Sequence, residues 1–363
     1  MEGGCRNLAA ADRVLEALSE AAFLRACRGL PVAHTPVWFM RQAGRSLPEY
    51  RALRRPGSSL ETVRQPDLAA EITLQPVRRY GVDAAILYSD IVVPVAAAGF
   101  GVEVEPGVGP VVPQPFRSAA DLARLGPFEP EADAPWVQET IRILRRELRV
   151  PLIGFAGAPF TVASYLIEGR PSRDHAATKR LMYSEPALWS DLLSRLGDLA
   201  LASLRAQVAA GAHAVQLFDS WIGALSPADY RRSVLPATAS IFAGLADLGV
   251  PRIHFGVGSG SLLALMAEAG ADVVGVDWRV PLDQARFAVG PGVALQGNLD
   301  PVVCLAPWPV VAGHAREVLE AAGGRTGHIF NLGHGVLPDT DPSVLERLVD
   351  LVHTSTAAQA SPP

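Results

Sequence analysis

The chain has 363 residues, 49% of them hydrophobic, and a formal net charge of −5. This length fits one α/β barrel of about 250 residues with insertions, and the charge excludes the general positive field that nucleic acid or an anionic membrane would require. No run approaches the roughly 18 consecutive apolar residues of a membrane-spanning helix.

The first predicted element is an amphipathic helix over residues 8–28, which we expect to cover one end of the core. After it, short apolar runs alternate with helical patterns. Eight runs are read as strands: 36–40, 84–89, 152–155, 214–219, 252–255, 273–278, 293–297 and 328–332. Helices are predicted at about 66–80, 133–149, 180–210, 226–248, 260–270, 281–289, 305–322 and 341–354, several of them starting near a proline. Apolar runs without alternation are typical of a parallel sheet covered on both faces, so strict βα order predicts a (β/α)₈ TIM barrel rather than an open doubly wound sheet.

Two segments lie outside this repeat. Residues 100–112 alternate in polarity and turn at a Pro-Gly pair, which predicts a β-hairpin inserted after the second strand. The segment 354–363 ends in Ser-Pro-Pro and is expected to be a disordered tail. The barrel is therefore expected to form one domain over residues 1–353.

The first predicted strand leads into a loop rich in arginine. Arg41, Arg45, Arg51 and Arg54 lie within fourteen residues, around Gly44. The guanidinium group keeps its charge and offers a planar set of donors that suits carboxylates and phosphates. The alternative is a solvated basic turn, as most surface charges are. The cluster indicates a small polyanionic ligand.

Polar side chains also follow other predicted strands, at the end of the barrel where such enzymes carry their chemistry. Asp90 follows the second strand, Ser220 the fourth and His334 the eighth, and Tyr165 lies on the helix after the third. Each has a structural alternative. Asp90 would be a helix cap, Ser220 a structural hydroxyl, His334 part of a turn between glycines and Tyr165 a core aromatic. If the strands form a barrel, the four side chains converge on one mouth.

No motif in the sequence indicates a cofactor or a metal site. Lys179 is the only lysine and lies in a predicted helix, which argues against Schiff-base and pyridoxal-phosphate chemistry. Cys5, Cys27 and Cys304 have no CxxC spacing, so neither a disulfide framework nor a cysteine-rich zinc site is indicated. The glycines of 256–260 lack the full dinucleotide-binding spacing. We expect catalysis without a cofactor, in the reducing cytoplasm.

Two longer stretches carry a family resemblance. Residues 36–45 (PVWFMRQAGR) and 154–161 (GFAGAPFT) resemble the two signature stretches of the uroporphyrinogen decarboxylase family. The match continues in order through 88–91, 218–221, 296–301 and 331–335. Phe160, where Trp is frequent, and Arg279, where Thr is common, are departures that touch no residue with an expected role.

This resemblance implies a homodimeric, cofactor-independent barrel enzyme of heme and porphyrin biosynthesis. It would convert the four acetate side chains of uroporphyrinogen III to methyls and give coproporphyrinogen III. The implied catalytic residues are Asp90, Arg41 and Tyr165, and the implied substrate-binding residues are Arg41, Gln42, Ala43, Gly44, Arg45, Arg54, Asp90, Tyr165, Ser220 and His334. In this pattern the carboxylate accepts hydrogen bonds from the pyrrole N–H groups, and the arginines hold the carboxylate arms. The proton donor stays open.

Two rival functions follow from the same residues. A cobalamin-linked methyltransferase shares this barrel but needs a His-x-Cys pair for zinc, and here the corresponding residues are His254, Phe255 and Gly256. A non-catalytic tetrapyrrole carrier would use the arginine loop only for capture. Release of CO₂ from uroporphyrinogen distinguishes the carrier from the decarboxylase.

Overall fold

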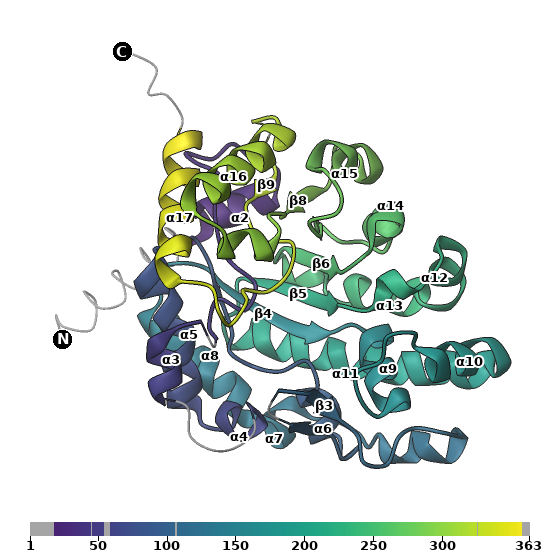
Figure 1. Cartoon of the computed structure of the whole chain (residues 1–363). Coiled ribbons are helices and arrows are strands. Elements are labelled where there is room, and N and C mark those ends of the chain that lie inside the picture. Colours follow the sequence, from purple (N-terminus) through teal and green to yellow (C-terminus); the bar gives the residue numbers. More distant parts are fainter. Residues whose placement is uncertain (1–17, 45, 54–58, 106, 325, 358–363) are drawn as a thin grey trace.

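The computed structural model of the chain describes residues 18–44, 46–53, 59–105, 107–324 and 326–357. In this part of the chain, seven parallel strands form one curved sheet surrounded by helices (Figure 1). The strands, in spatial order, are β1 (Ala85–Ile86), β4 (Leu152–Gly157), β5 (Ala214–Asp219), β6 (Arg252–Gly256), β7 (Val273–Gly275), β8 (Ala294–Gln296) and β9 (His328–Ile329). Spatial order follows chain order, as a βα barrel requires, so the predicted fold class is confirmed.

The first predicted strand, 36–40, is not a strand, although it lies where one was expected. Val37 makes a single parallel bridge with Phe330, beyond β9. On its other side, the N–H of Asp83 donates to the Val37 carbonyl (2.8 Å) just before β1. The segment thus joins the two edges of the sheet. Its ladder stays short because the Val37 N–H donates to a side chain, the carboxylate of Asp83 (2.7 Å), instead of to a backbone carbonyl.

Helices lie outside the sheet, and consecutive ones pack against each other. Their bounds are α2 (Ala22–Cys27), α3 (Pro48–Leu53), α4 (Ser59–Val63), α5 (Pro66–Tyr80), α6 (Val93–Ala97), α7 (Pro130–Asp133), α8 (Pro135–Glu147), α9 (Pro159–Glu168), α10 (Ala176–Ser184), α11 (Pro186–Ala210), α12 (Pro227–Ser233), α13 (Leu235–Ala243), α14 (Leu263–Glu268), α15 (Leu282–Val289), α16 (Trp308–Ala322) and α17 (Pro342–Thr356). Short 3-10 helices span Ala119–Arg124, Ile222–Ala224, Ala246–Leu248, Gly260–Leu262 and Pro301–Leu305. Many of the α-helices begin at proline. Proline suits the first turn because it lacks the N–H that would be unpaired there.

Two long predicted helices are interrupted. The segment 180–210 divides into α10 and α11 at Glu185, and 226–248 divides into α12, α13 and a 3-10 turn, with a break at Val234. Glu185 directly precedes Pro186, whose ring disfavours helical backbone at the residue before it. Val234 lies two residues before Pro236, and its φ of −130° ends the helical conformation. Of the predicted leading helix 8–28, α2 lies within the described residues and 8–17 lie outside them.

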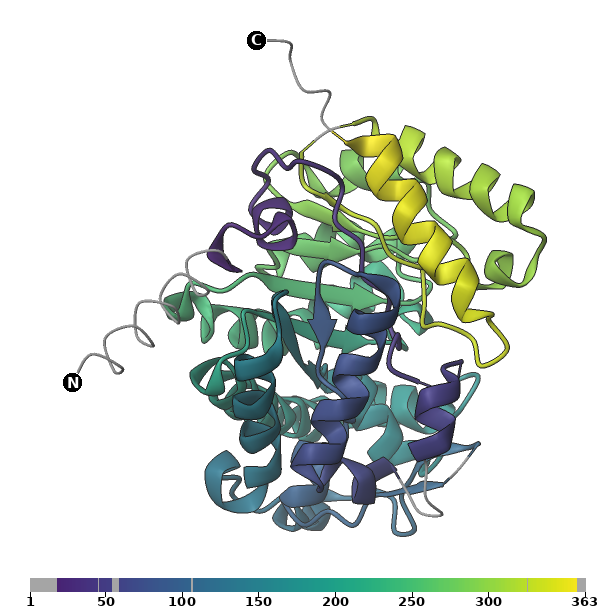
Figure 2. The same ribbon diagram turned by 90° about the vertical axis from the view of Figure 1, so that its left-hand side faces the viewer.

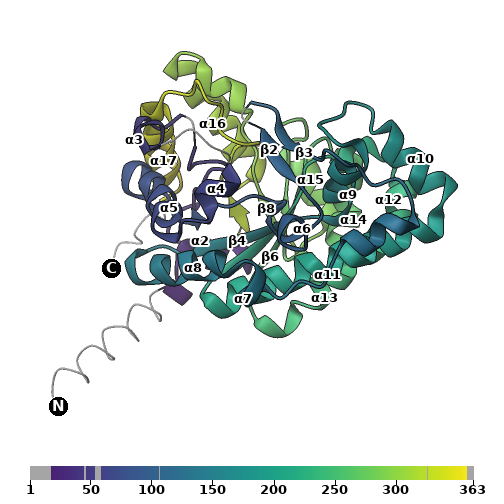
Figure 3. The same cartoon turned by 90° about the horizontal axis from the view of Figure 1, so that it is seen from below.

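The predicted hairpin at 100–112 is confirmed. β2 (Glu103–Glu105) and β3 (Gly109–Val111) are antiparallel, with Val104 opposite Pro110. The hairpin lies beside α4, and Val112 donates its N–H to the Gly169 carbonyl (2.8 Å) at the end of α9 (Figure 3). These contacts place it near the loops that follow β1 and β4.

The C-terminal helix extends past the predicted start of the tail at residue 354. α17 continues to Thr356, whose hydroxyl donates to the Val352 carbonyl (2.7 Å) and accepts from the Thr35 N–H (2.8 Å). This tertiary contact holds the last turn, and residues 358–363 lie outside the described part. Figure 2 shows α17 alongside α16. In the residues that the structure describes, no helix has the length and apolarity needed to cross a membrane.

Candidate active site at the carboxyl ends of the strands

The loop that begins at Arg41 is fixed to the last loop of the barrel. The N–H of Met40 donates to the Asn331 side-chain oxygen (3.0 Å), and the N–H of Val336 donates to the Met40 carbonyl (2.8 Å). Arg41 has a φ of 58°, a left-handed conformation that costs a residue with a Cβ about 1–2 kcal/mol. The exposed Arg41 side chain is therefore directed by a backbone that the neighbouring loop holds in place.

The Gln42 side chain makes its hydrogen bonds within the scaffold of the barrel. Its side chain is fully buried, its amide nitrogen donates to the Ala84 carbonyl (3.1 Å), and its amide oxygen accepts from the Phe39 N–H (3.0 Å). The Gln42 side chain therefore anchors the loop, and its predicted role in substrate binding stays a prediction. Ala43 and Gly44 are half-buried in the same loop. The predicted ligands Arg45 and Arg54 lie outside the described residues.

Gly335 makes room for the stem of Arg41. A Cβ at position 335 would lie 2.5 Å from Arg41 Cδ and 2.7 Å from Cγ, well inside van der Waals contact. These are stem atoms, so a methyl group there would require the whole Arg41 side chain to move. Gly335 therefore helps to place the Arg41 side chain.

Asp90 follows β1 and is half-buried. Its carboxylate accepts from the Val92 N–H (3.1 Å) and from the Ser59 hydroxyl (3.4 Å). Burial raises the pKa of Asp90, and the hydrogen bond from Val92 and the charge of Arg41 offset part of that rise. The hydrogen bond to Val92 confirms the turn-forming role of Asp90. The carboxylate is held in a setting that favours pairing with a positive charge.

Tyr165, from α9, is affected by the charges of both Asp90 and Arg41. Burial and the negative charge of Asp90 raise the pKa of Tyr165, the charge of Arg41 lowers it, and the net result is about 12. The phenol therefore stays protonated at neutral pH and can donate a hydrogen bond. Its ring lies against Trp221, with centroids 4.0 Å apart and planes at 39°. The aromatic contact fixes the ring, so Tyr165 joins Arg41 and Asp90 in one site.

His334 is half-buried in the loop after β9. Its Nδ1 accepts a hydrogen bond from the Gly335 N–H (2.6 Å), which places the proton of the neutral ring on Nε2. Burial, and then the charge of Arg41, lower the pKa of His334 to about 4. The imidazole is therefore neutral at physiological pH. It offers a neutral N–H donor beside the positive charge of Arg41.

Ser220 is half-buried directly after β5, in a turn supported by buried polar groups. The Thr161 hydroxyl donates to Asp219 (2.8 Å) and accepts from the Trp221 N–H (3.3 Å). The other Asp219 oxygen lies 3.6 Å from His254, and both side chains are fully buried. Thr161 and Asp219 therefore fix the backbone on both sides of Ser220.

A Thr161→Val variant is expected to lower the free energy of unfolding by about 2–4 kcal/mol, because it leaves a buried carboxylate without its hydroxyl donor. Thr161→Ser keeps the hydroxyl and is expected to lose only the contribution of one methyl group, about 1 kcal/mol. Equilibrium urea unfolding of both variants measures the difference. Equal losses would show that packing, not the hydrogen bond, accounts for Thr161.

Two contributors were missed from the sequence. Ser59 belongs to α4, remote from any predicted strand end, and no local pattern marks it as a partner of Asp90. Arg279, noted only as a departure from the family pattern, lies over Trp278 (3.9 Å to the ring centroid), donates to Asp277 (2.9 Å), and lowers the pKa of His334. Arg279 directly follows the sixth predicted strand, and this position could have predicted a further positive charge at the barrel mouth.

The thiol chemistry of a zinc methyltransferase finds no support in the described residues. Cys27 and Cys304 are buried, and burial raises the pKa of each, that of Cys304 to about 12. Both thiols therefore stay protonated at neutral pH. His254 is fully buried against Asp219 and belongs to no group of convergent metal ligands in this part of the chain.

Comparisons with known proteins point to one family. A family model described as uroporphyrinogen decarboxylase (URO-D) matches residues 18–355. A uroporphyrinogen decarboxylase of Streptomyces griseus is 63% identical over 350 residues, which cover 96% of each chain. One of Thermobifida fusca is 64% identical over 341 residues, 94% of each chain.

Solved structures extend the comparison of the fold. A methyltransferase from Methanosarcina mazei aligns with a TM-score of 0.76 and 22% identity, over 93% of this chain and 98% of its own. A B12-independent methionine synthase from Shewanella aligns with a TM-score of 0.51 and 13% identity, over 80% of this chain and 88% of its own. At these identities the similarity concerns the barrel, and the chemistry is decided by the residues at its mouth.

Proposed function

The chain belongs to the uroporphyrinogen decarboxylase family, whose members decarboxylate uroporphyrinogen in porphyrin and heme biosynthesis, and we propose that this chain does so at the barrel mouth around Asp90. The product is coproporphyrinogen III, formed when all four acetate arms of uroporphyrinogen III have become methyls. In each step a C–C bond breaks, CO₂ leaves, and one proton takes its place on the remaining carbon. The barrel acts as one catalytic domain.

Loss of CO₂ leaves electrons on carbon, so the reaction needs an electron sink. A pyrrole ring protonated on carbon is such a sink and carries a positive charge. Asp90 is proposed to accept hydrogen bonds from the pyrrole N–H groups and to stabilise that charge. Because burial raises the pKa of Asp90, its anion is poorly solvated in the free protein and gains more than a surface carboxylate from a cationic partner.

Arg41 is proposed to hold the carboxylate arm nearest the reacting centre. A guanidinium binds carboxylate through two parallel hydrogen bonds, and its orientation is set by the anchored loop and by Gly335. Arg45 and Arg54 are proposed to hold further acetate and propionate arms. Tyr165, Ser220 and the Nε2–H of His334 would donate to carboxylate oxygens and orient the macrocycle. The observation that carries this assignment is the convergence of Arg41, Asp90 and Tyr165.

Anaerobic incubation of the purified protein with uroporphyrinogen III, followed by oxidation and chromatography of the porphyrins, tests the function. We expect porphyrins with seven, six, five and four carboxylates, and one CO₂ for each carboxylate lost. Binding of uroporphyrinogen without release of CO₂ would instead identify a carrier.

Ser220→Ala is expected to raise KM about three- to tenfold and to leave kcat within about twofold, because it removes one neutral hydrogen bond to bound substrate. Ser226→Ala is the matched control. Ser226 caps α12 by accepting from the Asp229 N–H (3.1 Å), so its loss should lower stability without changing KM. A fall in kcat alone for Ser220→Ala would contradict an orienting role.

The protein is also proposed to be a cytoplasmic homodimer. Large apolar side chains at the surface support an oligomer, among them Phe287 (92% exposed) and Val302 (60% exposed). Size-exclusion chromatography with light scattering tests the dimer, and cell fractionation tests the compartment. A monomeric mass at micromolar concentration would contradict the first.

A further inference from the structure

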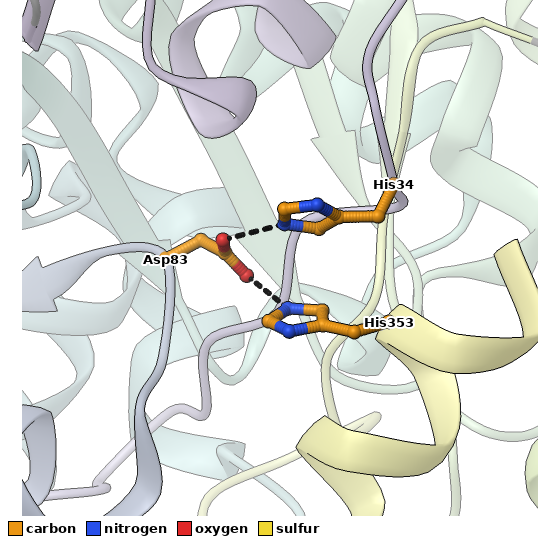
Figure 4. Close-up of side chains that lie close together, drawn as sticks. All are labelled: His34, Asp83 and His353. Carbon is orange, nitrogen blue, oxygen red and sulfur yellow. Dashed lines mark hydrogen bonds and ion pairs between the residues drawn. The ribbon is translucent and has the colours of Figure 1, made fainter. Parts of the chain in front are cut away.

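Two histidines and one aspartate form a cluster (Figure 4). It lies at the opposite end of the barrel from Asp90. Asp83 lies two residues before β1 (Ala85–Ile86) and Asp90 lies four residues after it, so the two carboxylates belong to opposite ends of this strand. His34 precedes the segment 36–40, and His353 lies near the end of α17. The cluster therefore cannot touch a ligand held at the mouth.

The three side chains converge on a common point. His34 Nε2 lies 2.9 Å from Asp83 Oδ1, and His353 Nε2 lies 2.7 Å from Oδ2. The two imidazole rings are close and tilted relative to each other, with centroids 4.1 Å apart and planes at 49°. Figure 4 shows both rings directed at one carboxylate from two separate segments of the chain. One donor atom from each residue lies within 4.8 Å of the other two.

The cluster is accessible to ions from solvent. The side chains of His34 and His353 are each 29% exposed, and that of Asp83 is 14% exposed. The Val37 N–H donates to Asp83 Oδ2 (2.7 Å) and holds the carboxylate in its orientation. Such an outer hydrogen bond is typical of carboxylates that bind metal ions.

The donor set selects a class of ion. Two imidazoles and one carboxylate suit Zn²⁺ and neighbouring transition metals, whereas Mg²⁺ and Ca²⁺ prefer oxygen ligands throughout. In a tetrahedral zinc site, bonds of about 2.0–2.1 Å place ligand atoms about 3.4 Å apart. The present N–O distances would need to lengthen by only about half an ångström, a shift that side-chain rotation supplies.

We propose that His34, Asp83 and His353 bind one divalent transition-metal ion of the zinc type, with water completing the coordination. To present a lone pair, each neutral imidazole moves its proton from Nε2 to Nδ1, and an imidazolium releases one proton to solvent. An imidazole binds metal only in its unprotonated form, so protons compete with the metal and affinity rises with pH. The ion would tie α17 to the segment before 36–40 and to β1. Its role is therefore stabilising, since it lies at the end of the barrel remote from the chemistry.

Titration of the metal-free, full-length protein with Zn²⁺, followed by calorimetry and by thermal unfolding, tests the proposal. We expect one equivalent to bind and Tm to rise with zinc concentration. His353→Gln should weaken binding by more than about tenfold and abolish the rise in Tm. The control is His314→Gln, since His314 is an exposed histidine of α16 that lies 3.3 Å from Glu317, and this variant should bind as the wild type does. A wild-type protein without an equivalent of bound zinc overturns the proposal.

A second measurement needs no variant. Co²⁺ in place of Zn²⁺ should give visible d–d absorption, and anomalous diffraction at the zinc edge should place one peak between His34, Asp83 and His353. A peak elsewhere, or none, would show that the cluster is held by protons alone. Zinc binding and decarboxylation are separate readouts, so an inactive protein that binds zinc overturns only the enzymatic assignment.

Discussion

Asp90→Asn is expected to lower kcat for uroporphyrinogen decarboxylation by at least about 10²-fold while leaving the free energy of unfolding undiminished. The asparagine oxygen can still accept from the Val92 N–H, so the turn after β1 is kept. What is lost is the negative charge that would stabilise the protonated pyrrole. Steady-state kinetics and urea unfolding on the same preparations measure the two effects. Near-normal turnover in this variant would exclude Asp90 from the chemistry.

The pH dependence of stability gives an independent check on Asp90. Burial raises its pKa above the ordinary value of 3.8, so the ionised carboxylate opposes folding. The stability contributed by this group is fully present below pH 3.8 and is lost as pH rises through the folded pKa. Asp90→Asn should therefore equal or exceed the wild type in stability at neutral pH, and the two should converge in acid. A less stable Asn variant at pH 7 would show that the carboxylate is a structural requirement.

Arg41→Gly is expected to lower kcat/KM by at least about 10²-fold, because it removes the fork that positions the reacting arm. Glycine suits this site better than alanine as a test of function. Arg41 has a φ of 58°, which glycine adopts without strain, so the free energy of unfolding should stay the same or rise by up to about 1 kcal/mol. The measurement is a comparison of kcat/KM with Tm. Loss of Tm in parallel with activity would indicate a structural role for the guanidinium.

Gly335→Ala tests the placement of Arg41 without removing its charge. The new methyl group would overlap the arginine stem, so we expect activity between those of the wild type and Arg41→Gly. Gly313→Ala is the control, because a Cβ there meets nothing within 4 Å and the residue lies inside α16. That variant should gain about 0.5–1 kcal/mol of stability and keep full activity.

The order of strands and helices was predictable because each βα unit carries its own local signals. Apolar runs predicted the sheet, and prolines at positions such as 66, 135 and 342 marked the first turns of helices. The segment 36–40 was misread because its apolar composition indicates burial but does not reveal its pairing. The Asp83 side chain takes the N–H of Val37, and that bond depends on a residue 46 positions away.

The candidate site was predictable as a set of residues but not as a set of interactions. Strand ends and the family motifs led to Arg41, Asp90, Tyr165, Ser220 and His334. Nothing local shows that Gln42 turns into the scaffold, that Ser59 reaches Asp90, or that Arg279 affects His334. These facts depend on how loops from different units pack at the mouth, and single-sequence patterns carry no such information.

By itself, the sequence determined the barrel class and the family, because contiguous residues carry their signals, and it led to the prediction that the Arg41 loop binds a polyanion. Only the tertiary structure decided how the side chains act. It showed that Gly335 leaves space for the Arg41 stem, and it brought His34, Asp83 and His353 to one point. The physical reason is chain separation: His34 and His353 belong to opposite ends of the chain, and they meet only because closing the barrel packs the last helix against the first segments.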